Sequence, residues 1–465
     1  MQKSLIPVFA AVAILLLFSC KKDSLITSPN AILNVTDSIK FDTVFTTTGS
    51  VTKSFKIFND NNQRLLISKI RLMGGSTSPF KLNINGIAAM EANDIEVAAN
   101  DSIYIFVSVT INPSTANLPF VISDSILINY NGNSRFVQLQ AYGQNANFLR
   151  NAIITGNTSW NNTLPYVILG SLRIDTTATL TIAAGTKIYL HADAPFIVDG
   201  TLLINGTKDQ RVFFTGDRLD DPYRDFPAGW PGIYLRGSSS NSVFNFAVIK
   251  NAYQAVVVQG PSVNSNPKLL MQKVIIDNAY DAGIFCTNTN IQVNNSLISN
   301  CGSNIVIQGG GSYALTHCTV ASYSTQFILH NKPVLYASDN AFINGTIFYG
   351  SMNAVFKNCI FWGDNNIVNN EVVTDKQGAV PFSVTLDHCL YKAANDPANT
   401  TLTSVIKNSD PAFDSTDYSH NYFNFRISNP LAPGIDKGIL TPFPKDLDDN
   451  PRNVGAPDIG CYEKQ

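Results

Sequence analysis

Six segments in the second half of this chain repeat one short pattern, and this repetition constrains the fold more than any other feature. A small residue starts each repeat, and a branched or aromatic residue follows two positions later. The intervals between starts are 27, 22, 22, 41 and 30 residues, so each fits one coil with insertions, and the interval of 41 also fits two coils. The first positions are Ala247, Val274, Ser296, Cys318, Cys359 and Cys389, and the second are Ile249, Ile276, Ile298, Val320, Phe361 and Tyr391.

Strand geometry explains the pattern. Residues two apart on a strand point to the same face, so the small residue and its bulky follower both point inward. When successive coils stack in parallel, equivalent residues repeat about 4.8 Å apart and form a column along the bore. Asn251, Asn278 and Asn300, four positions after the start, then fall at a bend, followed by Ser322 and Gly363 in later repeats. A side-chain amide there can satisfy turn backbone that lacks a ladder partner.

The segment before these repeats also predicts stacked coils. From about residue 148, short β runs close with Gly-Thr, as at Gly185-Thr186 and Gly200-Thr201, without intervening helical patterns. The tract resembles right-handed parallel β-helix proteins of the pectate-lyase-like superfamily. Residues 458–463 closely resemble the D-I-G-A-Y-E ending found after such helices in bacterial surface proteins, with Cys461 in place of Ala. We therefore expect a right-handed parallel β-helix, a solenoid, over residues 147–400 and a C-terminal cap over residues 401–465.

The segment over residues 31–146 predicts a separate β-sandwich. Apolar and polar residues alternate in several short runs, and Asn-rich and Gly-rich turns separate these runs. About seven short strands in one domain of this size are typical of an immunoglobulin-like sandwich. The segment resembles the immunoglobulin-like modules that precede the main domain in many bacterial surface proteins, and it has neither the Cys pair nor the Trp of antibody domains. The whole chain is expected to be all-β.

The N-terminus predicts export and a lipid anchor. Lys3 precedes an apolar run from Ile6 to Phe18 that is too short to span a bilayer. Leu17-Phe18-Ser19-Cys20 resembles a bacterial lipobox, in which the signal is cut before a Cys that then carries the acyl chains. We expect a lipoprotein signal peptide over residues 1–19, lipidation at Cys20 and a tether over residues 20–30. The chain resembles a surface lipoprotein of Bacteroidota-like bacteria, which implies the cell envelope, at the outer membrane. An ordinary secretory peptide with an incidental Cys is the alternative.

Composition narrows the partners. Charged residues make up 14% of the chain, and the formal net charge is -2. Without a long basic run, the sequence argues against nucleic acid as a partner. The expected partners are a membrane, through the lipid anchor, and a polysaccharide or cell-surface glycan.

Enzymatic activity has little support in the sequence. A polysaccharide lyase needs a Lys or Arg base near a carboxylate-held Ca²⁺, and a hydrolase needs paired carboxylates. No Arg occurs between Gly237 and Phe425, and the acids there share no register. We expect a non-catalytic binding or structural module, with a glycan as candidate ligand. The alternative is a polysaccharide lyase or glycoside hydrolase, for which a model should gather acids with Lys or Arg in one groove, whereas a binder should show aromatic and amide residues alone.

The residue before each small inward position should face outward and offers a candidate glycan surface. Neutral His and Asn side chains hydrogen-bond well to sugar hydroxyls. A solvated strand face without a ligand explains the same residues. The candidate glycan-facing residues are Asn295, His317, Asn358 and His388.

Metal and disulfide sites are weak expectations. Asp217, Asp220, Asp221 and Asp225 crowd one loop and could bind Ca²⁺, but Arg218 and Arg224 stand among them and favour a self-neutralised insertion. No other metal or cofactor is expected. Cys318, Cys359 and Cys389 occupy the inward small position, where stacked parallel Cβ vectors favour free thiols over disulfides. The pattern leaves Cys286, Cys301 and Cys461 undecided.

Overall fold

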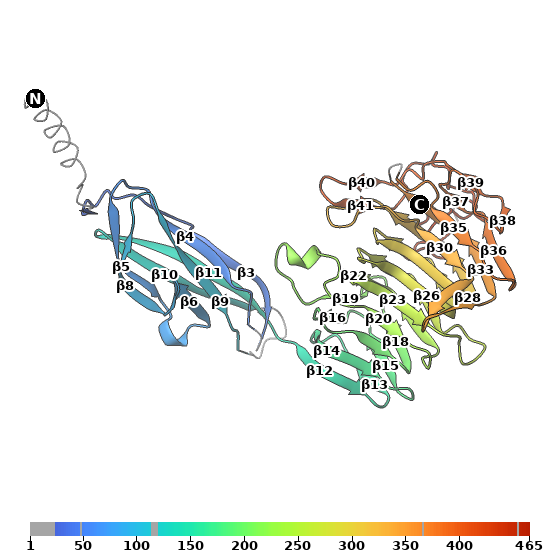
Figure 1. The fold of residues 1–465 in the computed structure, drawn as a ribbon, viewed down its shortest axis with the longest axis horizontal. Helices are drawn as coiled ribbons and strands as arrows, with labels where there is room; N and C mark the ends of the chain where they lie inside the picture. Colours follow the sequence, from blue (N-terminus) through green and yellow to red (C-terminus); the bar gives the residue numbers. More distant parts are fainter. Residues whose placement is uncertain (1–23, 47–48, 113–119, 365–366, 453–454) are drawn as a thin grey trace, which may run out of the picture. The chain divides into compact units, whose positions relative to one another are not determined.

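The computed structural model describes residues 24–46, 49–112, 120–364, 367–452 and 455–465, and Cys20 lies outside these ranges. The chain divides into two compact units between Asn145 and Ala146 (Figure 1). Almost all regular structure is β, and the helical segments among the described residues are the short 3-10 turns η1 (Gly75–Thr77) and η2 (Tyr223–Asp225). The expectation of an all-β chain is confirmed.

The N-terminal unit is a sandwich of two sheets around one apolar core. The core takes alternate residues of each strand, such as Ile57 and Phe55 or Leu65 and Ile67, because period-two alternation turns one face of a strand inward. The first sheet contains β1 (Leu25–Ile26), β3 (Ser38–Phe45), β5 (Arg64–Leu72), β8 (Glu91–Val97), β10 (Phe120–Tyr130) and β11 (Asn133–Gln144), and the second contains β2 (Leu33–Val35), β4 (Lys53–Asn59), β6 (Phe80–Ile84), β7 (Ile87–Ala88) and β9 (Ser102–Val109).

The sandwich begins earlier than the sequence suggested. Leu25 and Ile26, placed in the tether, form strand β1 and pair with Arg64 and Leu65 of β5. The Asn131 side-chain amide, at the β10–β11 turn, donates to the carbonyls of Ile26 and Ser28, 2.9 and 3.0 Å away. The expected tether over residues 20–30 is therefore wrong from Leu25 onward, because these residues are hydrogen-bonded to the domain.

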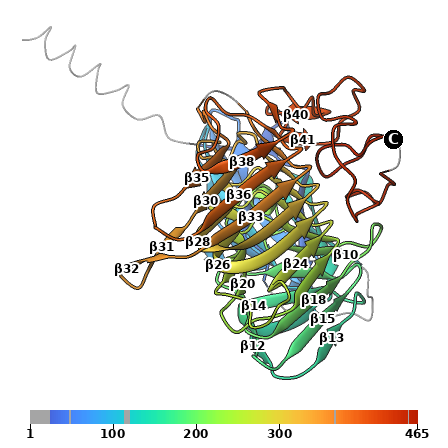
Figure 2. The same ribbon diagram turned by 90° about the vertical axis from the view of Figure 1, so that its right-hand side faces the viewer.

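The C-terminal unit is a parallel β-helix whose 26-stranded sheet wraps into three faces, here called tracks 1, 2 and 3 (Figures 1 and 2). Each coil passes through track 1, then track 2, then track 3, and pairs with the same track of the next coil. Track 1 contains β12 (Asn147–Ile154), β14 (Tyr166–Ile174), β16 (Lys187–Leu190), β19 (Val212–Gly216), β22 (Ala247–Lys250), β25 (Ile275–Asp277), β27 (Leu297–Ser299), β29 (Thr319–Ser322), β34 (Ile360–Gly363), β37 (Leu390–Tyr391) and β39 (Ile406–Lys407).

The long strands of the helix turn a corner and serve two tracks, as β12 and β14 do for tracks 1 and 2. Track 2 continues through β17 (Phe196–Val198), β20 (Ile233–Leu235), β23 (Gln254–Gln259), β26 (Ala282–Asn294), β28 (Ser303–Thr316), β30 (Leu335–Ser338) and β35 (Val372–Asp375). Track 3 contains β13 (Thr158–Trp160), β15 (Thr179–Ala183), β18 (Thr201–Asn205), β21 (Ser242–Asn245), β24 (Leu269–Gln272), the second halves of β26 and β28, β33 (Met352–Lys357), β36 (Phe382–Asp387) and β38 (Thr400–Thr403).

The inward column predicted from the sequence is confirmed residue by residue. Ile276 pairs with Ile298, Ile298 pairs with Val320, and Val320 pairs with Phe361. The interval of 41 residues is therefore one coil with an insertion. The insertion includes a hairpin of β31 (Asn340–Ile343) and β32 (Thr346–Tyr349).

The thiols of the six described cysteines are free and buried. Cys318, Cys359 and Cys389 fill the inward small position as predicted, and burial raises the pKa of Cys318 and Cys359. The three that the sequence left undecided are also packed away from solvent.

A single residue in left-handed conformation connects track 3 to track 1 in six consecutive coils. An L-residue seldom adopts this conformation, which costs about 1 kcal/mol or more, so its repetition marks a corner that the fold requires. The six residues, with φ between 47° and 57°, are Phe246, Lys273, Asn295, His317, Asn358 and His388.

The Asn corner between tracks 1 and 2 also uses left-handed residues, but its hydrogen bonds differ from the expectation. Asn278 donates to the Oδ1 atom of Asn251 at 2.9 Å, which is one rung of a ladder. Asn251 itself donates to the backbone carbonyl of Arg224 in a loop, and Asn300 donates to the carboxylate of Asp277. The amides therefore hold surface loops as much as they hold neighbouring coils.

Residues 408–465, called the C-terminal strap, do not cap the end of the helix. The final coil continues through β38 and β39 to Lys407, so the expected boundary at residue 400 falls too early. The strap, which carries the hairpin of β40 (Ser415–Asp417) and β41 (Tyr422–Asn424), then runs back along the outside of track 1 (Figure 2). Its reach is shown by Arg211, which donates to the carbonyl of Leu447 at 2.9 Å.

A second apolar layer forms beneath the strap. Outward residues of track 1, Leu297, Ile360 and Leu390, are almost fully buried and pack against Leu447 and Ile459 of the strap. Burial of each such side chain contributes roughly 1.5–3 kcal/mol. In these coils track 1 is apolar on both faces, and the strap is part of the folded unit.

The register can be tested on two adjacent residues of β33. Phe356 points inward and is fully buried, whereas Val355 points outward and is 37% exposed. Phe356→Asp should lower the free energy of unfolding by several kcal/mol, because it buries a carboxylate without a partner. Val355→Asp should change it by less than about 0.5 kcal/mol. Denaturant unfolding of both variants measures the contrast, and a larger loss from Val355→Asp would mean that the two faces are exchanged.

Candidate functional site

The candidate glycan surface is covered in the structure. Asn295, His317 and Asn358 do project from the helix, as their corner conformation requires, but they are buried beneath the C-terminal strap. His317 Nε2 lies 3.1 Å from the Thr441 hydroxyl, and Asn358 Nδ2 donates to the Ile439 carbonyl at 2.8 Å. The prediction that these three residues face a ligand is wrong, because a distant segment occupies their outer side.

The burial of His317 has an electrostatic consequence. Burial, reinforced by the nearby Arg452 guanidinium, lowers the pKa of His317 to about 2. The imidazole is therefore neutral at physiological pH. His388, the fourth candidate, is partly exposed, and its Nδ1 lies 2.7 Å from the Asp387 carboxylate. None of the four lines the groove described below.

The C-terminal motif holds the strap in place. Arg452 donates to Glu463 Oε2 at 2.9 Å, to the Gly460 carbonyl at 3.0 Å and to Asn295 Oδ1 at 3.1 Å. Both charged side chains of the Arg452–Glu463 pair are buried. Backbone N–H groups of Gly460 and Cys461 donate to the Asn358 carbonyl and the Thr319 hydroxyl. The motif thus holds the strap against the sides of several coils.

The four candidate calcium ligands are engaged in separate contacts. Asp217 lies 2.8 Å from His191 Nδ1, and Asp220 accepts two hydrogen bonds from Arg218. Asp221 and Asp225 lie 3.0 and 3.4 Å from Arg224. Within the part of the chain that the structure describes, no group of three or more His, Cys, Asp or Glu side chains is arranged to hold a metal ion.

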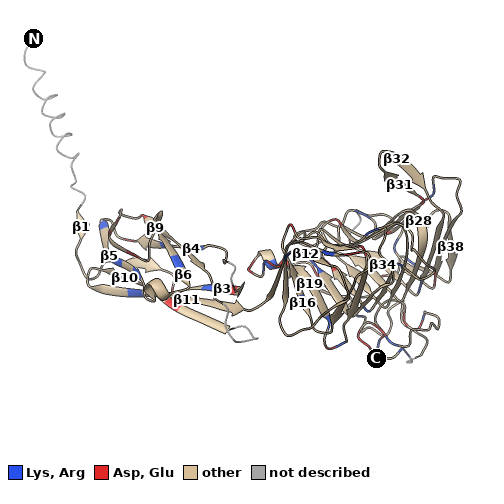
Figure 3. Cartoon of the chain, turned by 90° about the horizontal axis from the view of Figure 1, so that it is seen from below, with Lys and Arg blue, Asp and Glu red and all other residues tan. Residues whose placement is uncertain are grey.

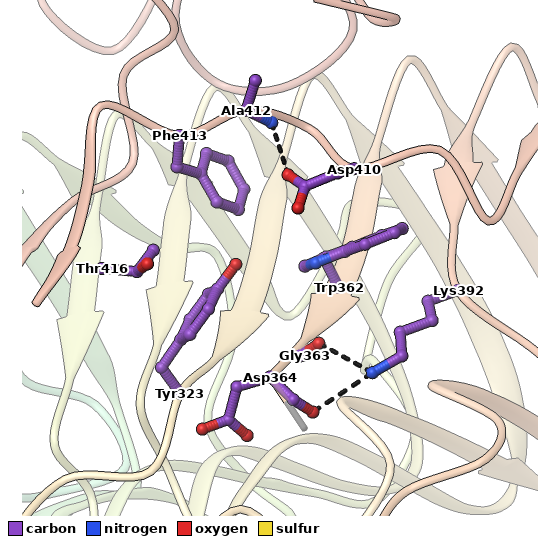
Figure 4. Close-up of a pocket in the computed structure, with 9 residues that line it drawn as sticks. All are labelled: Tyr323, Trp362, Gly363, Asp364, Lys392, Asp410, Ala412, Phe413 and Thr416. Carbon is purple, nitrogen blue, oxygen red and sulfur yellow. Dashed lines mark hydrogen bonds between the residues drawn. The ribbon is translucent and has the colours of Figure 1, made fainter. Parts of the chain in front are cut away.

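A groove of about 580 Å³ lies between the end of track 1 and the start of the strap (Figure 4). β29 and β34 end side by side and place Tyr323 and Trp362 on one wall. The strap contributes the other wall with Asp410 and Phe413. The lining residues are Tyr323, Trp362, Gly363, Asp364, Lys392, Asp410, Ala412, Phe413 and Thr416.

Aromatic rings form the apolar part of the groove. Trp362 directly follows the inward Phe361, so strand alternation turns its indole outward, where the strap leaves 8% of it exposed. The Tyr323 and Phe413 rings meet edge to face with centroids 6.4 Å apart. Burial, with the carboxylates of Asp410 and Asp364 nearby, raises the pKa of Tyr323, so its hydroxyl keeps its proton.

Charged groups form the polar part. Lys392 Nζ donates to the carbonyls of Gly363 and Asp364, 3.0 and 3.2 Å away. Asp364 Oδ2 accepts from the Ser324 backbone N–H at 2.7 Å, whereas its Oδ1 is buried and has no hydrogen-bond partner among the described residues. Asp410 Oδ1 accepts from the Ala412 N–H at 2.7 Å.

Gly363 allows this wall to form. Behind it lies a buried pair in which His330 Nε2 is 3.0 Å from Glu371 Oε1. A Cβ atom at position 363 would approach both groups within 2.2 Å. The sequence places Gly363 in the repeat, four positions after Cys359. It does not show why the residue is glycine, because the side chains that leave no room there, His330 and Glu371, are distant in the chain.

The groove meets the criterion set for an enzyme, and it does not meet the criterion for a binder, because it contains charged residues and no amide side chain. It gathers two acids with a Lys, as an enzyme should, and three aromatic residues, as a binder should. Sequence reasoning missed the site because its strap residues lie far from β29 and β34 in the chain. Trp362, an aromatic residue at an outward strand position, was the available signal.

Comparisons with known proteins identify no relative. No protein-family model and no curated protein match the chain. Among solved structures, a Vibrio cholerae VesB protease matches with 13% identity and a TM-score of 0.17, over 24% of this chain and 31% of the protease. A family 123 glycoside hydrolase from Clostridium perfringens has 11% identity and a TM-score of 0.18, over 27% of this chain and 26% of the hydrolase.

A human ASH/PapD-like domain has 11% identity and a TM-score of 0.18, over 27% of this chain and 92% of that domain. The chain spans about a third of the protease and about a quarter of the hydrolase. At these TM-scores the similarities assign no function.

Proposed function

We propose that this chain is a lipid-anchored protein of the bacterial cell envelope whose β-helix binds a carbohydrate without cleaving it. The observation that carries the proposal is the groove lined by Tyr323, Trp362 and Phe413 together with Asp364 and Asp410. The Ig-like sandwich serves as a spacer between the anchor and the β-helix.

The groove has the two kinds of surface that a sugar ring needs. The C–H face of a pyranose is apolar and packs on an aromatic ring, whereas its edge carries hydroxyl groups. Carboxylate oxygens accept hydrogen bonds from such hydroxyls, and the Tyr323 hydroxyl can donate one. Apolar walls with a few placed polar groups are typical of small-ligand sites.

Binding explains the groove better than cleavage does. A lyase base must offer an amine lone pair to the substrate, but the Lys392 ammonium donates to two backbone carbonyls of its own wall. Cleavage as a polysaccharide lyase or glycoside hydrolase remains the competing function, because Asp364 and Asp410 line the same groove. Incubation of the intact chain with any glycan that it binds, followed by analysis of the products, separates the two functions.

The anchor is proposed from the lipobox-like sequence that ends at Cys20. Among the described residues, no helix has the length and apolar character needed to cross a bilayer. Two or three acyl chains on one Cys would hold a folded domain at the membrane surface. We place the protein at the outer membrane on the same sequence argument.

The glycan site can be tested by substitution in the groove. Trp362→Ala should weaken binding of a glycan found by array screening about tenfold, because the loss of one stacked ring is worth about 1.4 kcal/mol. Asp410→Asn, on the exposed loop, should weaken binding without lowering the melting temperature. Tyr280→Ala is a control for the loss of an exposed ring on another coil, since Tyr280 is 54% exposed. Because Trp362 is only 8% exposed and packs against Leu390 and Ile459, the melting temperature of Trp362→Ala is measured beside its binding. Equal binding by Trp362→Ala, Asp410→Asn and the control would exclude this groove.

The anchor requires a separate test. Cys20→Ser should move the protein from the detergent phase to the aqueous phase or leave the signal peptide uncut, because the thioether to the lipid cannot form. Phase partition and intact mass measure both results. Unchanged partition of a processed Cys20→Ser chain would contradict lipidation at this residue.

A further inference from the structure

The β31–β32 hairpin projects from the corner between tracks 2 and 3 (Figures 2 and 3). It carries an unusual density of exposed apolar side chains. Phe342 is 75% exposed, Ile347 is 52% exposed, and Tyr349 is 41% exposed. Ile343 and Phe348 are exposed to 40% and 39%. Single exposed apolar residues are ordinary on protein surfaces, but a contiguous group of this kind marks an interaction site.

The hairpin is apolar on both of its faces. Phe342 pairs with Ile347 across the ribbon, and both point to one side. Ala341 pairs with Phe348, and both point to the other side together with Ile343. Ala341 is buried and Phe348 packs partly on the β-helix, so the second face is free of the helix only toward the tip, at Ile343. Exposed apolar side chains on both sides of the tip suit a medium that surrounds the tip better than a partner that covers one face.

The hairpin also lacks charged side chains, which favours an apolar surrounding. No Asp, Glu, Lys or Arg occurs from Asn340 to Phe356, and the tip is the uncharged turn Asn344-Gly345. At the base of the hairpin, the exposed Lys376 stands beside the carboxylates of Asp375 and Asp339, so the base carries no net positive charge. An uncharged tip of aromatic and aliphatic groups matches the acyl boundary of a lipid surface.

Hydrogen bonds and side-chain packing hold the base of the hairpin. The Asp339 carboxylate is buried and accepts hydrogen bonds from the backbone N–H groups of Gln377 and Gly378, at 3.0 and 2.9 Å. Phe348 packs over Gly309, where a Cβ atom would lie 3.3 Å from its ring. These contacts fix the ribbon against β28 and against the loop after β35.

We propose that the β31–β32 hairpin inserts its tip into the surface of a lipid bilayer. Each strand has four residues and spans about 13 Å, which is well short of the roughly 30 Å hydrocarbon core. The hairpin therefore enters one leaflet and does not cross the bilayer. This contact is independent of the lipid anchor proposed at Cys20 and of the carbohydrate groove.

The test uses the Cys20→Ser chain after removal of the signal peptide, checked by intact mass, so that neither an acyl chain nor the apolar run from Ile6 to Phe18 contributes. The probes are vesicles of phosphatidylcholine, alone and mixed with phosphatidylglycerol, and bound protein is measured by sedimentation. Replacing Phe342 and Ile347 together by Ser should lower the partition coefficient about tenfold or more, because both exposed side chains lose their apolar contact with lipid. Replacing Leu431 and Leu440 by Ser is the matched control, since these residues of the strap are 89% and 85% exposed.

Light scattering without lipid separates a bilayer from a second copy of the chain. The proposal predicts that hairpin and control variants have the same mass in lipid-free solution and differ on vesicles. Equal vesicle binding by the two variants would overturn it. A lipid-free oligomer that the hairpin substitutions dissociate would also overturn it, and would assign the hairpin to self-association.

Discussion

One left-handed residue at the corner between tracks 3 and 1, repeated in six consecutive coils, is the constraint on which this part of the β-helix depends. It turns the chain abruptly, so that the next residue, such as Ser296 or Cys318, begins track 1 with its side chain inward. Six coils repeat this turn without glycine, and the strain is offset by the apolar column that it makes possible. The same turn drives side chains such as Asn295 and Asn358 out of the helix, where the strap can bind them.

The strap packs against the side chains that leave the helix at this corner. Its apolar residues cover track 1, and its buried Arg452 joins Glu463 to Asn295 of a central coil. Removal of one partner from such a buried pair leaves an uncompensated charge and costs about 3–5 kcal/mol. The carbohydrate groove depends on the same arrangement, because Trp362 comes from the helix and Asp410 comes from the strap.

Much of the fold could be predicted because it arises from local periodicity. The inward column from Ile249 to Tyr391 and the strands of the sandwich follow from side-chain alternation within a few residues. The burial of His317 and Asn358 could not be predicted, since it depends on Thr441 and Ile439, which lie far along the chain. For the same reason the groove was missed, and the motif around Gly460 was taken for an end cap although it locks the strap against the side of the helix.

Hydrogen exchange on Arg452→Met tests most directly whether the C-terminal strap is bound along the side of the β-helix. The strap amides of Ile459, Gly460 and Cys461 bond to Gly434, Asn358 and Thr319, so they should exchange much faster once the buried pair is broken. The inward strands around Ile298 should keep their protection, because neighbouring coils still hold them. Faster exchange only in β38 and β39 of the last coil, with unchanged exchange in the C-terminal strap, would contradict this account. It would indicate that the C-terminal segment caps the end of the helix.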